Sequence, residues 1–222
     1  MPKKIKSIAI TQYDYIIRDF RDEELDIHGH PHHFTEFDRN GHPLKEIKYD
    51  RKGDFEEMFS FEYDEKGLLV RESYYPEEDM AAEETTYEWD SKGLLVNSIK
   101  HYLEGSADTT TYFYDDNHRL VKKITASEDE EPQEEIFEYE GEPHDAQGIA
   151  DEQDTNHRIT RNENGQVILE EVYSDEEVLL TKIERKFNED GNPSEVEIYI
   201  DGQGKTISRH YFLHYDYIFF ED

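Results

Sequence analysis

Hydrophobic and polar positions alternate along this chain in short runs that return at nearly constant intervals. The stretch FEYDEKGLLVRESYY at 61–75 is followed by YEWDSKGLLVNSIKHY at 87–102 and by YFYDDNHRLVKKI at 112–124. Each copy has alternating aromatic residues, an acid, a turn and an apolar run, which is typical of β-strands joined by tight turns. The acid, or an asparagine in its place, recurs every 22 to 28 residues, at Asp14, Asp38, Asp64, Asp90, Asp115, Glu140, Asn162, Asn188 and Asp216. This spacing predicts a repeat architecture.

Each copy contains the sequence of a type I turn that is closed by glycine. In Asp64-Glu65-Lys66-Gly67, the aspartate side chain can cap the turn, and the glycine can take the left-handed conformation that closes a hairpin through a bulge. The turn residues assigned on this basis are Asp38, Gly41, Asp64, Gly67, Asp90, Gly93, Asn162, Gly165, Asn188 and Gly191.

This hairpin register sets an aromatic residue opposite an aliphatic one across each pair of strands. The expected pairs are Tyr63 with Leu69, Trp89 with Leu95, Tyr114 with Leu120, Phe37 with Pro43 and Phe187 with Pro193. Such pairs stabilise antiparallel strands by roughly 0.2–1 kcal/mol each. The residues expected to have this structural role are Phe37, Phe61, Tyr63, Tyr87, Trp89, Tyr112, Tyr114 and Phe187.

The predicted fold is all-β, an antiparallel meander of about eight hairpin repeats. A sheet of about sixteen strands is too long to remain open and flat, so we expect it to curl or to split into two packed parts. The repeat pattern is interrupted after Tyr139, where no apolar strand follows. The expected organisation is therefore a hairpin-repeat segment at 1–139, an acidic loop at 140–157 and a second hairpin-repeat segment at 158–222.

The aromatic segment 211–220 has apolar residues on both faces of its expected strand, and 13–17 has a similar pattern. Such a strand cannot lie exposed at an edge without inviting association. Pairing with the N-terminal strand, coverage by a folded-over segment, or a homodimer through the edge would each protect it. We expect burial within the chain, and either a monomer or an edge-mediated homodimer.

Composition bears on the possible binding partners mainly through the net charge. The 222 residues are 34% hydrophobic and 36% charged, with a net charge of −32. Nucleic acids and anionic membranes are disfavoured as partners, because binding to phosphate needs clusters of lysine and arginine. A basic protein is favoured. The acidic connections at 76–84, 128–135 and 175–177 should form one negative rim, which is either a solvated surface or a binding surface.

Neither a disulfide nor an export signal is evident. The chain has no cysteine, and its longest apolar runs fall short of the roughly 18 residues of a membrane span. No apolar segment of a signal peptide follows Met1-Pro2-Lys3-Lys4, so a cytoplasmic protein is the default expectation, although a removed export signal would leave the same sequence.

The repeated phrase FEYDEKGLL at 61–69 resembles the YD repeat of the Rhs family, closely over 34–125 and loosely over 158–217. The arginine that often follows glycine in that family is replaced by Leu68 or Leu94 here. The Asn-Gly pairs at 40–41 and 164–165 also resemble bacterial MORN-type repeats, though more weakly. Both resemblances imply a β-hairpin array with a scaffold or binding role instead of catalysis.

The sharpest candidate for metal chemistry is HGHPHH, which contains His28, His30, His32 and His33. Interleaved imidazoles could hold zinc, nickel or copper, but Gly29 and Pro31 favour a polar loop. An EF-hand-like spacing from Thr160 to Glu171 begins with threonine where aspartate is required, and strand patterns surround it. The hydrolase, nucleotide-binding and metalloprotease motifs are missing. We therefore expect no catalytic residues and no cofactor.

Three functions remain open. The first is a non-enzymatic repeat scaffold that binds another protein. The second is an immunity or antitoxin-like acidic partner of a basic toxin, which the charge of −32 favours. The third is a carbohydrate-active hydrolase or glycan-binding sheet, because exposed aromatic residues could form a sugar-binding platform.

Overall fold

The structure is a computed structural model, and it describes residues 3–17, 25–128, 130–139, 156–202 and 208–221. Within these ranges every regular element is a β-strand, so none of the described residues belongs to a helix that could cross a membrane. In chain order the strands are β1 (Ile5–Ile17), β2 (Leu25–Phe37), β3 (Pro43–Tyr49), β4 (Phe55–Tyr63), β5 (Leu69–Tyr75), β6 (Glu83–Trp89), β7 (Leu95–Tyr102), β8 (Ala107–Tyr114), β9 (Leu120–Ala126), β10 (Gln133–Ile136), β11 (Asn156–Arg161), β12 (Val167–Tyr173), β13 (Leu179–Phe187), β14 (Pro193–Ile200) and β15 (Arg209–Phe219).

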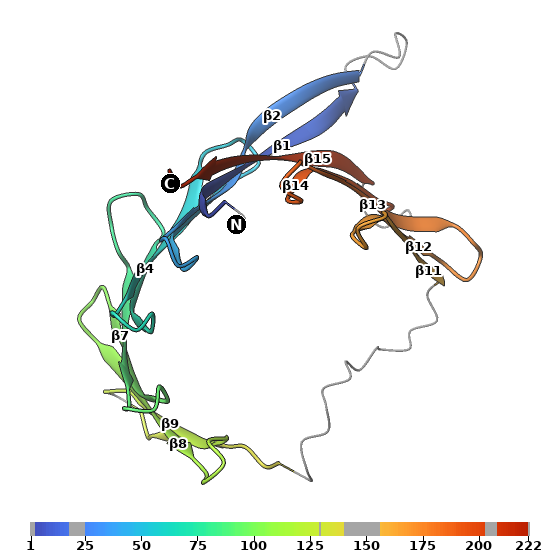
Figure 1. Ribbon diagram of the computed structural model, residues 1–222. Helices are drawn as coiled ribbons and strands as arrows, with labels where there is room; N and C mark the ends of the chain where they lie inside the picture. Colours follow the sequence, from blue (N-terminus) through green and yellow to red (C-terminus); the bar gives the residue numbers. More distant parts are fainter. Residues whose placement is uncertain (1–2, 18–24, 129, 140–155, 203–207, 222) are drawn as a thin grey trace. The chain divides into compact units, whose positions relative to one another are not determined.

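The strands form one antiparallel sheet that is not closed, in the order β10-β9-β8-β7-β6-β5-β4-β3-β2-β1-β15-β14-β13-β12-β11 (Figure 1). Strands that are consecutive in the chain are neighbours in the sheet, except β10 and β11, which lie at opposite edges. In addition, the first strand β1 is the neighbour of the last strand β15. The prediction of an all-β antiparallel meander is therefore confirmed. The two aromatic ends of the sequence pair with each other, with Tyr13 opposite Phe212 and Ile10 opposite Tyr215.

The described residues group into two compact units. One draws on residues 1–34, 49–54 and 148–222, and the other on residues 35–48 and 55–147. This division differs from the expected segments 1–139 and 158–222, because β1 pairs with β15 and joins the C-terminal strands. Residues 140–155 of the expected loop lie outside the described residues. Its last two residues belong to β11, which begins at Asn156.

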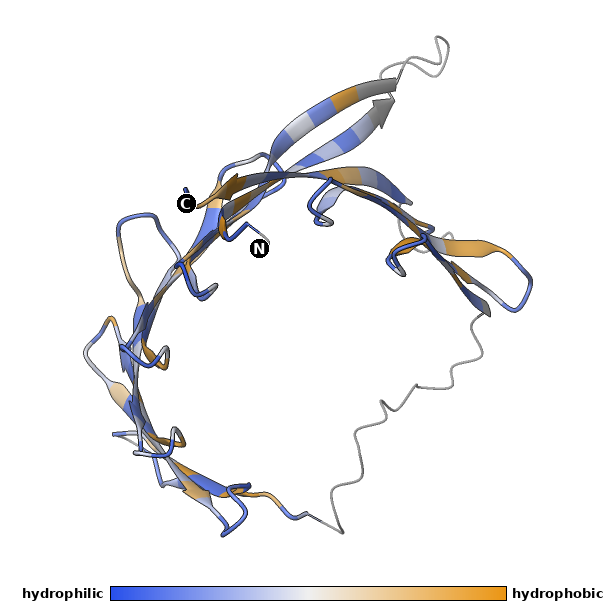
Figure 2. Cartoon of the chain, in the orientation of Figure 1, coloured by the Kyte–Doolittle hydropathy of each residue, from blue (hydrophilic) through white to orange (hydrophobic). Residues whose placement is uncertain are grey.

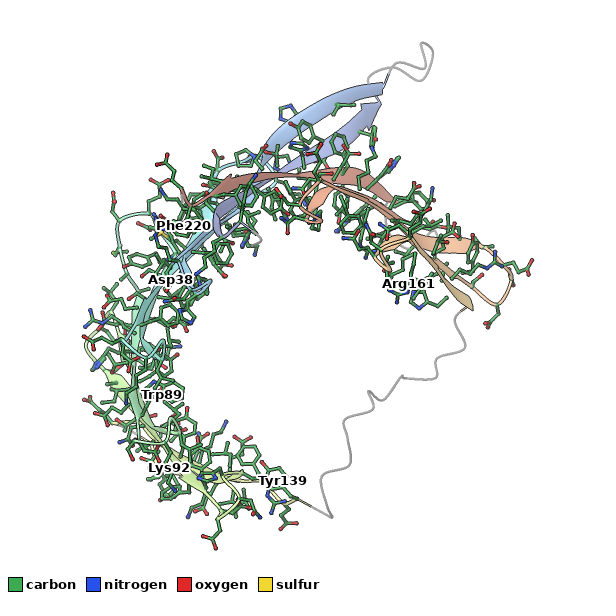
Figure 3. The ribbon with its side chains drawn as sticks, viewed as in Figure 1. Asp38, Trp89, Lys92, Tyr139, Arg161 and Phe220 are labelled. Carbon is green, nitrogen blue, oxygen red and sulfur yellow. The ribbon has the colours of Figure 1, made fainter. Side chains whose placement is uncertain are left out.

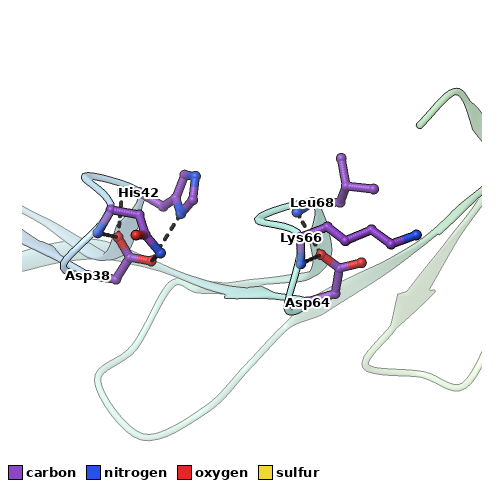
Figure 4. Close-up of polar contacts among 6 residues, drawn as sticks. Asp38, His42, Asp64, Lys66 and Leu68 are labelled. Atoms are coloured by element: carbon purple, nitrogen blue, oxygen red, sulfur yellow. Dashed lines mark hydrogen bonds and ion pairs between the residues drawn. The ribbon is translucent and has the colours of Figure 1, made fainter. Parts of the chain in front are cut away.

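The hairpin turns have the geometry that the Asx-Gly sequences require. Gly67 has a φ of 81°, and its N–H donates to the carbonyl of Asp64 over 3.0 Å. The Asp64 Oδ1 accepts from the backbone N–H groups of Lys66 at 2.8 Å and Leu68 at 2.9 Å, and Asp38 caps its own turn in the same way (Figure 4). A positive φ is also found at the assigned glycines Gly41, Gly93, Gly165 and Gly191.

Several turns use the same geometry at positions that the repeat pattern did not mark. Asp50 to Gly53 closes β3 onto β4, and its glycine has a φ of 85°. His118 and Glu177 take the left-handed position with φ values of 62° and 58°, although they are not glycines. The first and last members of the acidic series, Asp14 and Asp216, lie within strands β1 and β15 instead of in turns.

Four of the five expected aromatic–aliphatic pairs are confirmed across the hairpins, and the pair of Phe37 with Pro43 stays a prediction. Tyr63 lies opposite Leu69, Trp89 opposite Leu95, Tyr114 opposite Leu120 and Phe187 opposite Pro193, each next to a β-bulge.

A second role of these aromatic residues was not expected from the sequence. Trp89 and Tyr114 donate hydrogen bonds to the first residue of the preceding strand in the chain, Trp89 Nε1 to Leu69 O at 2.7 Å and Tyr114 OH to Leu95 O at 3.0 Å. Two further tyrosines do the same, Tyr139 OH to Leu120 O at 2.8 Å and Tyr217 OH to Pro193 O at 2.8 Å. At these four positions the aromatic residue therefore links one strand pair to the strand before it; the equivalent Phe37 and Phe187 have no polar atom to do so.

The sheet has almost no enclosed core. Val196, which is 8% exposed, is the only buried hydrophobic residue in the described part of the chain. Side chains project from both faces of the strands, and hydrophilic residues occur along the strands as well as in the connections (Figures 2 and 3). Stability must therefore come largely from strand pairing and from half-buried side-chain contacts on the surface of the sheet.

Two connections predicted from polar sequence are instead strands. The HGHPHH tract is part of β2, so the expectation of a loop at Gly29 and Pro31 was wrong. Strand β10 occupies the end of the acidic stretch 128–135, with Glu134 opposite Ile124 and Glu135 opposite Lys123. In both cases pairing with a neighbouring strand outweighs a weak local preference for strand.

Candidate binding face

Four neighbouring strands, β13, β14, β15 and β1, carry a cluster of aromatic and charged side chains on one face. We call this cluster the aromatic–carboxylate face. It consists of Tyr13, Tyr15, Lys182, Glu184, Glu197, Tyr199, His210 and Phe212. All eight residues belong to the same compact unit.

The strand register explains why residues so distant in sequence share this face. Glu184 lies opposite Glu197, Glu197 opposite Phe212, and Phe212 opposite Tyr13. The neighbouring row runs from Lys182 through Tyr199 to His210. Residues that are directly opposite each other in a sheet point to the same side, so the two rows form one continuous surface.

The aromatic rings of this face stack on one another. The rings of Tyr13 and Phe212 are 4.6 Å apart and nearly parallel, at 4°. The Tyr15 ring stacks on the His210 imidazole at 4.3 Å, and Tyr199 meets the same imidazole edge-on at 6.1 Å. These contacts hold the rings in a fixed order across three strands.

A glycine in the adjacent strand β2 provides the space for Tyr13. A Cβ atom on Gly29 would lie 2.5 Å from Cε1 of Tyr13, which is closer than carbon atoms can approach. The tyrosine ring therefore occupies the space that a side chain at residue 29 would need, an arrangement that compensates for the missing side chain in the strand although Gly29 remains exposed.

Glu197 is the centre of the polar contacts on the face. Its Oε1 atom lies 2.7 Å from Nε2 of His210 and accepts a longer hydrogen bond, of 3.4 Å, from the Tyr15 hydroxyl. Burial, together with the negative charge of Glu197, raises the pKa of Tyr15 above its ordinary value. The hydroxyl thus remains protonated and acts as a donor. Glu197 and His210 are 36% and 46% exposed, so solutes can reach both.

The second carboxylate of the face is paired with a lysine. Lys182 Nζ lies 2.7 Å from Glu184 Oε2, and this hydrogen bond raises the pKa of the lysine, against a smaller opposing effect of burial. Glu171 and Glu197 add to the negative surroundings of Lys182. A hollow of about 290 Å³ lies between these groups, lined by Leu179, Lys182, Glu184, Glu197, Tyr199 and His210.

The chemistry of this face suits a cationic or planar group. Tyrosine rings attract ammonium and guanidinium groups through their negative faces, and a carboxylate at the ring edge adds a charge-assisted hydrogen bond. The same rings could stack against the apolar face of a sugar.

The histidines of the HGHPHH tract do not converge on a metal site. His28, His30 and His32 alternate along β2 and so point to one face, whereas His33 points to the other. His30 is 3% exposed, its Nε2 lies 3.1 Å from Asp14 Oδ2, and its Nδ1 lies 3.0 Å from the carbonyl of Pro31. Among the described residues, no group of three or more His, Asp or Glu side chains has the arrangement of a metal site.

The turn and aromatic residues assigned from the sequence occupy the hairpins and do not gather into a site. Phe61 lies opposite Glu72, Tyr87 opposite Ser98 and Tyr112 opposite Lys123. Phe37 ends β2, next to the turn at Asp38. Burial, reinforced by the charge of Glu72 next to its hydroxyl, raises the pKa of Tyr87 to about 12. Their role in this structure is to join strands.

Sequence reasoning missed the residues of the aromatic–carboxylate face. The alternation of His210, Phe212 and His214 was visible, as was that of Tyr13 and Tyr15. The missing information was that β1 and β15 are neighbours in the sheet, because that pairing joins residues from nearly opposite ends of the sequence.

Comparisons with known proteins add little to this picture. No family model matches the chain, and no curated protein matches it. A porin-like protein from Bacteroides uniformis is similar in structure with a TM-score of 0.40 and 11% identity, over 98% of this chain and 99% of that chain. TcdB2-TccC3-TEV is similar with a TM-score of 0.39 and 13% identity, over 78% of this chain and 11% of that chain. At these scores neither likeness supports a functional argument.

Proposed function

We propose that this chain is a non-enzymatic β-repeat scaffold that binds another protein through the aromatic–carboxylate face. The observation that carries the proposal is the ordered row of Tyr199, His210 and Tyr15 beside the partly exposed carboxylate of Glu197. The repeats are those of a YD-type hairpin array, and the matching ligand group is a lysine or arginine side chain of the partner.

Charge supports a basic partner over other classes. The chain carries a net charge of −32, so a basic protein is attracted from a distance and a nucleic acid is repelled. An acidic immunity or antitoxin-like partner of a basic toxin is the second candidate, because the same charge favours it. A glycan-binding sheet is the third, and the stacked rings of Tyr13 and Phe212 are the observation in its favour.

A titration with defined ligands separates the two candidates that bind a basic protein from the glycan-binding sheet. Lysine- and arginine-rich peptides, peptides of reversed charge and a panel of neutral oligosaccharides would be titrated at low and at high salt. We expect the basic peptides alone to bind, with affinity that falls as salt increases. Binding of the oligosaccharides in preference to the peptides would favour the glycan-binding function.

Variants locate the binding surface. Glu197→Gln and Tyr199→Leu should each weaken binding of the basic peptide several-fold. Glu163→Gln is the matched control, since Glu163 lies in the exposed turn between β11 and β12 and its replacement removes the same charge. Equal losses in Glu197→Gln and Glu163→Gln would mean that only net charge matters and would overturn the assignment of the face.

A further inference from the structure

The two edges of the sheet carry opposite charges. Strand β10 forms one edge and strand β11 the other, so each has a neighbour on one side only among the described residues. Strand β10 is exposed along its length and contains Glu134 and Glu135, whose carboxylates also form exposed ion pairs with Lys122 and Lys123 of β9. Strand β11 contains His157, Arg158 and Arg161 and no acidic residue.

Both edges offer backbone groups for pairing. The N–H of Phe137 donates to the carbonyl of Val121 on β9. Along an antiparallel strand, every second residue forms hydrogen bonds with a given neighbouring strand. The backbone groups of Glu134 and Ile136 therefore point away from β9. At the other edge the N–H of Asn162 donates to Gln166 beside β12. By the same alternation, the groups of Ile159 and Arg161 point outward.

Both edge strands also carry exposed apolar side chains. Ile136 is 65% exposed and Ile159 is 48% exposed. Natural sheets usually protect such edges, because an unpaired strand with apolar residues is a template for another strand. Neither edge contains a proline or an inserted bulge on its outer strand among the described residues.

We propose that copies of this chain associate edge to edge, with β10 of one copy paired to β11 of the next. Charge selects this combination. Pairing β10 with β10 would oppose glutamates, and pairing β11 with β11 would oppose arginines, whereas β10 with β11 opposes glutamate and arginine.

The sheet topology fixes the direction of the new pair. The sheet is antiparallel and has fifteen strands, an odd number, so its two edge strands run in the same direction. Copies that keep the same face on the same side therefore join through a parallel pair, which mixed sheets accommodate. The contact uses two different surfaces, so association continues into rings or open chains instead of stopping at a symmetric dimer.

Sedimentation velocity over a range of protein concentrations tests the proposal. The unaltered protein should form larger species as concentration rises. The double variants Glu134→Lys/Glu135→Lys and Arg158→Glu/Arg161→Glu should each weaken self-association about tenfold or more, because each opposes like charges at the contact. An equimolar mixture of the two variants should associate again, since lysine on β10 of one then meets glutamate on β11 of the other. A misfolded variant could not give this recovery.

A proline pair checks that the contact uses the backbone. Ile136→Pro removes an outward N–H and should weaken association with little change in stability. Glu135→Pro is the matched control, because it removes an N–H that points toward β9 and should reduce stability. A protein that stays monomeric at every concentration would overturn the proposal, and so would variants that associate as strongly as the original or a mixture that fails to recover. If the two edges paired within one chain, the protein would stay monomeric at every concentration, and this too would overturn the proposal.

Discussion

The indole N–H of Trp89 donates a hydrogen bond of 2.7 Å to the backbone carbonyl of Leu69, the first residue of the neighbouring strand β5. Tyr114, Tyr139 and Tyr217 make the equivalent bond to Leu95, Leu120 and Pro193. Each bond satisfies a carbonyl next to a β-bulge, where the regular ladder is interrupted. These four aromatic residues thus have a polar role as well as an apolar one.

Removal of one hydroxyl measures this link between hairpins. Tyr114→Phe should lower the free energy of unfolding by about 0.5–1.5 kcal/mol, the usual contribution of a hydrogen bond, because the Leu95 carbonyl loses its donor. Tyr74→Phe is the control, since among the described residues the Tyr74 hydroxyl has no hydrogen-bond partner while its ring packs on Phe59 at 5.0 Å. Chemical denaturation should show a loss in the first variant only, and equal stabilities would contradict the link.

The turn glycines give a second prediction. Gly93→Val should destabilise the fold by roughly 1–2 kcal/mol, because Gly93 has a φ of 83° and a β-branched residue is strained there. Gly67→Val should cost at least as much, since a Cβ would also lie 2.8 Å from Cε1 of His42. Gly93→Asn should cost less, because asparagine tolerates this conformation. Unchanged denaturation midpoints for both valine variants would contradict the turn geometry.

Stability should depend on pH through Asp38. Partial desolvation opposes its ionisation, but hydrogen bonds from the His42 backbone, the His42 ring and the Asn40 backbone outweigh it and lower the pKa to about 2, from an ordinary value of 3.8. A carboxyl group with a lowered folded-state pKa stabilises the protein above its unfolded pKa, and this contribution is lost as pH falls from about 4 through 2.

Asp38→Asn isolates this contribution. Asparagine caps the equivalent turn at Asn162, where its Oδ1 accepts from Asn164 and Gln166, so the variant keeps the turn. Urea denaturation at neutral and at acidic pH should show a smaller loss of stability on acidification in Asp38→Asn than in the original protein. Asn162→Asp should show a larger loss. Equal pH dependence in all three proteins would exclude the effect.

Gly29 should control the position of Tyr13. Gly29→Ala places a methyl group against the Tyr13 ring, so we expect lower stability and a changed tyrosine signal in near-ultraviolet circular dichroism. In a Tyr13→Leu background the same substitution should cost much less, because the ring is gone. A double-mutant cycle measures this coupling, and additive effects would show that the ring does not limit residue 29.

Deletion of residues 211–222 should unfold or aggregate the protein. Those residues contain most of β15, and their loss would leave β1 and β14 without a shared neighbour. Light scattering and sedimentation would follow the truncated chain. A folded, soluble monomer would show that β15 is dispensable to the sheet.

Local sequence was sufficient to predict much of the fold. The Asx-x-x-Gly turns and the alternating aromatic residues specify hairpins by their own chemistry, so pairs such as Tyr63 with Leu69 could be placed correctly. The strand at His28–His33 could not, because Gly29 and Pro31 disfavour strands and only the neighbouring strand overrides them.

The residues of the aromatic–carboxylate face could not be predicted from local sequence. His210, Glu197 and Tyr15 meet only because β15 lies between β14 and β1. Two aromatic ends of similar pattern indicated that each needed protection, but several arrangements would have given it. The register that sets Tyr13 opposite Phe212 depends on pairing between distant segments, which a single sequence does not specify.

The β1–β15 pairing also bears on how the chain folds during synthesis. Most strand pairs join neighbours in sequence and can form as soon as both strands have left the ribosome, because closing a short loop costs little entropy. The pair of β1 with β15 must instead wait until β15 emerges, after all the other described strands have been made. During that interval one side of β1, including Ile8 and Ile10, has no partner, and it is the segment on which a chaperone would act or misassembly would begin.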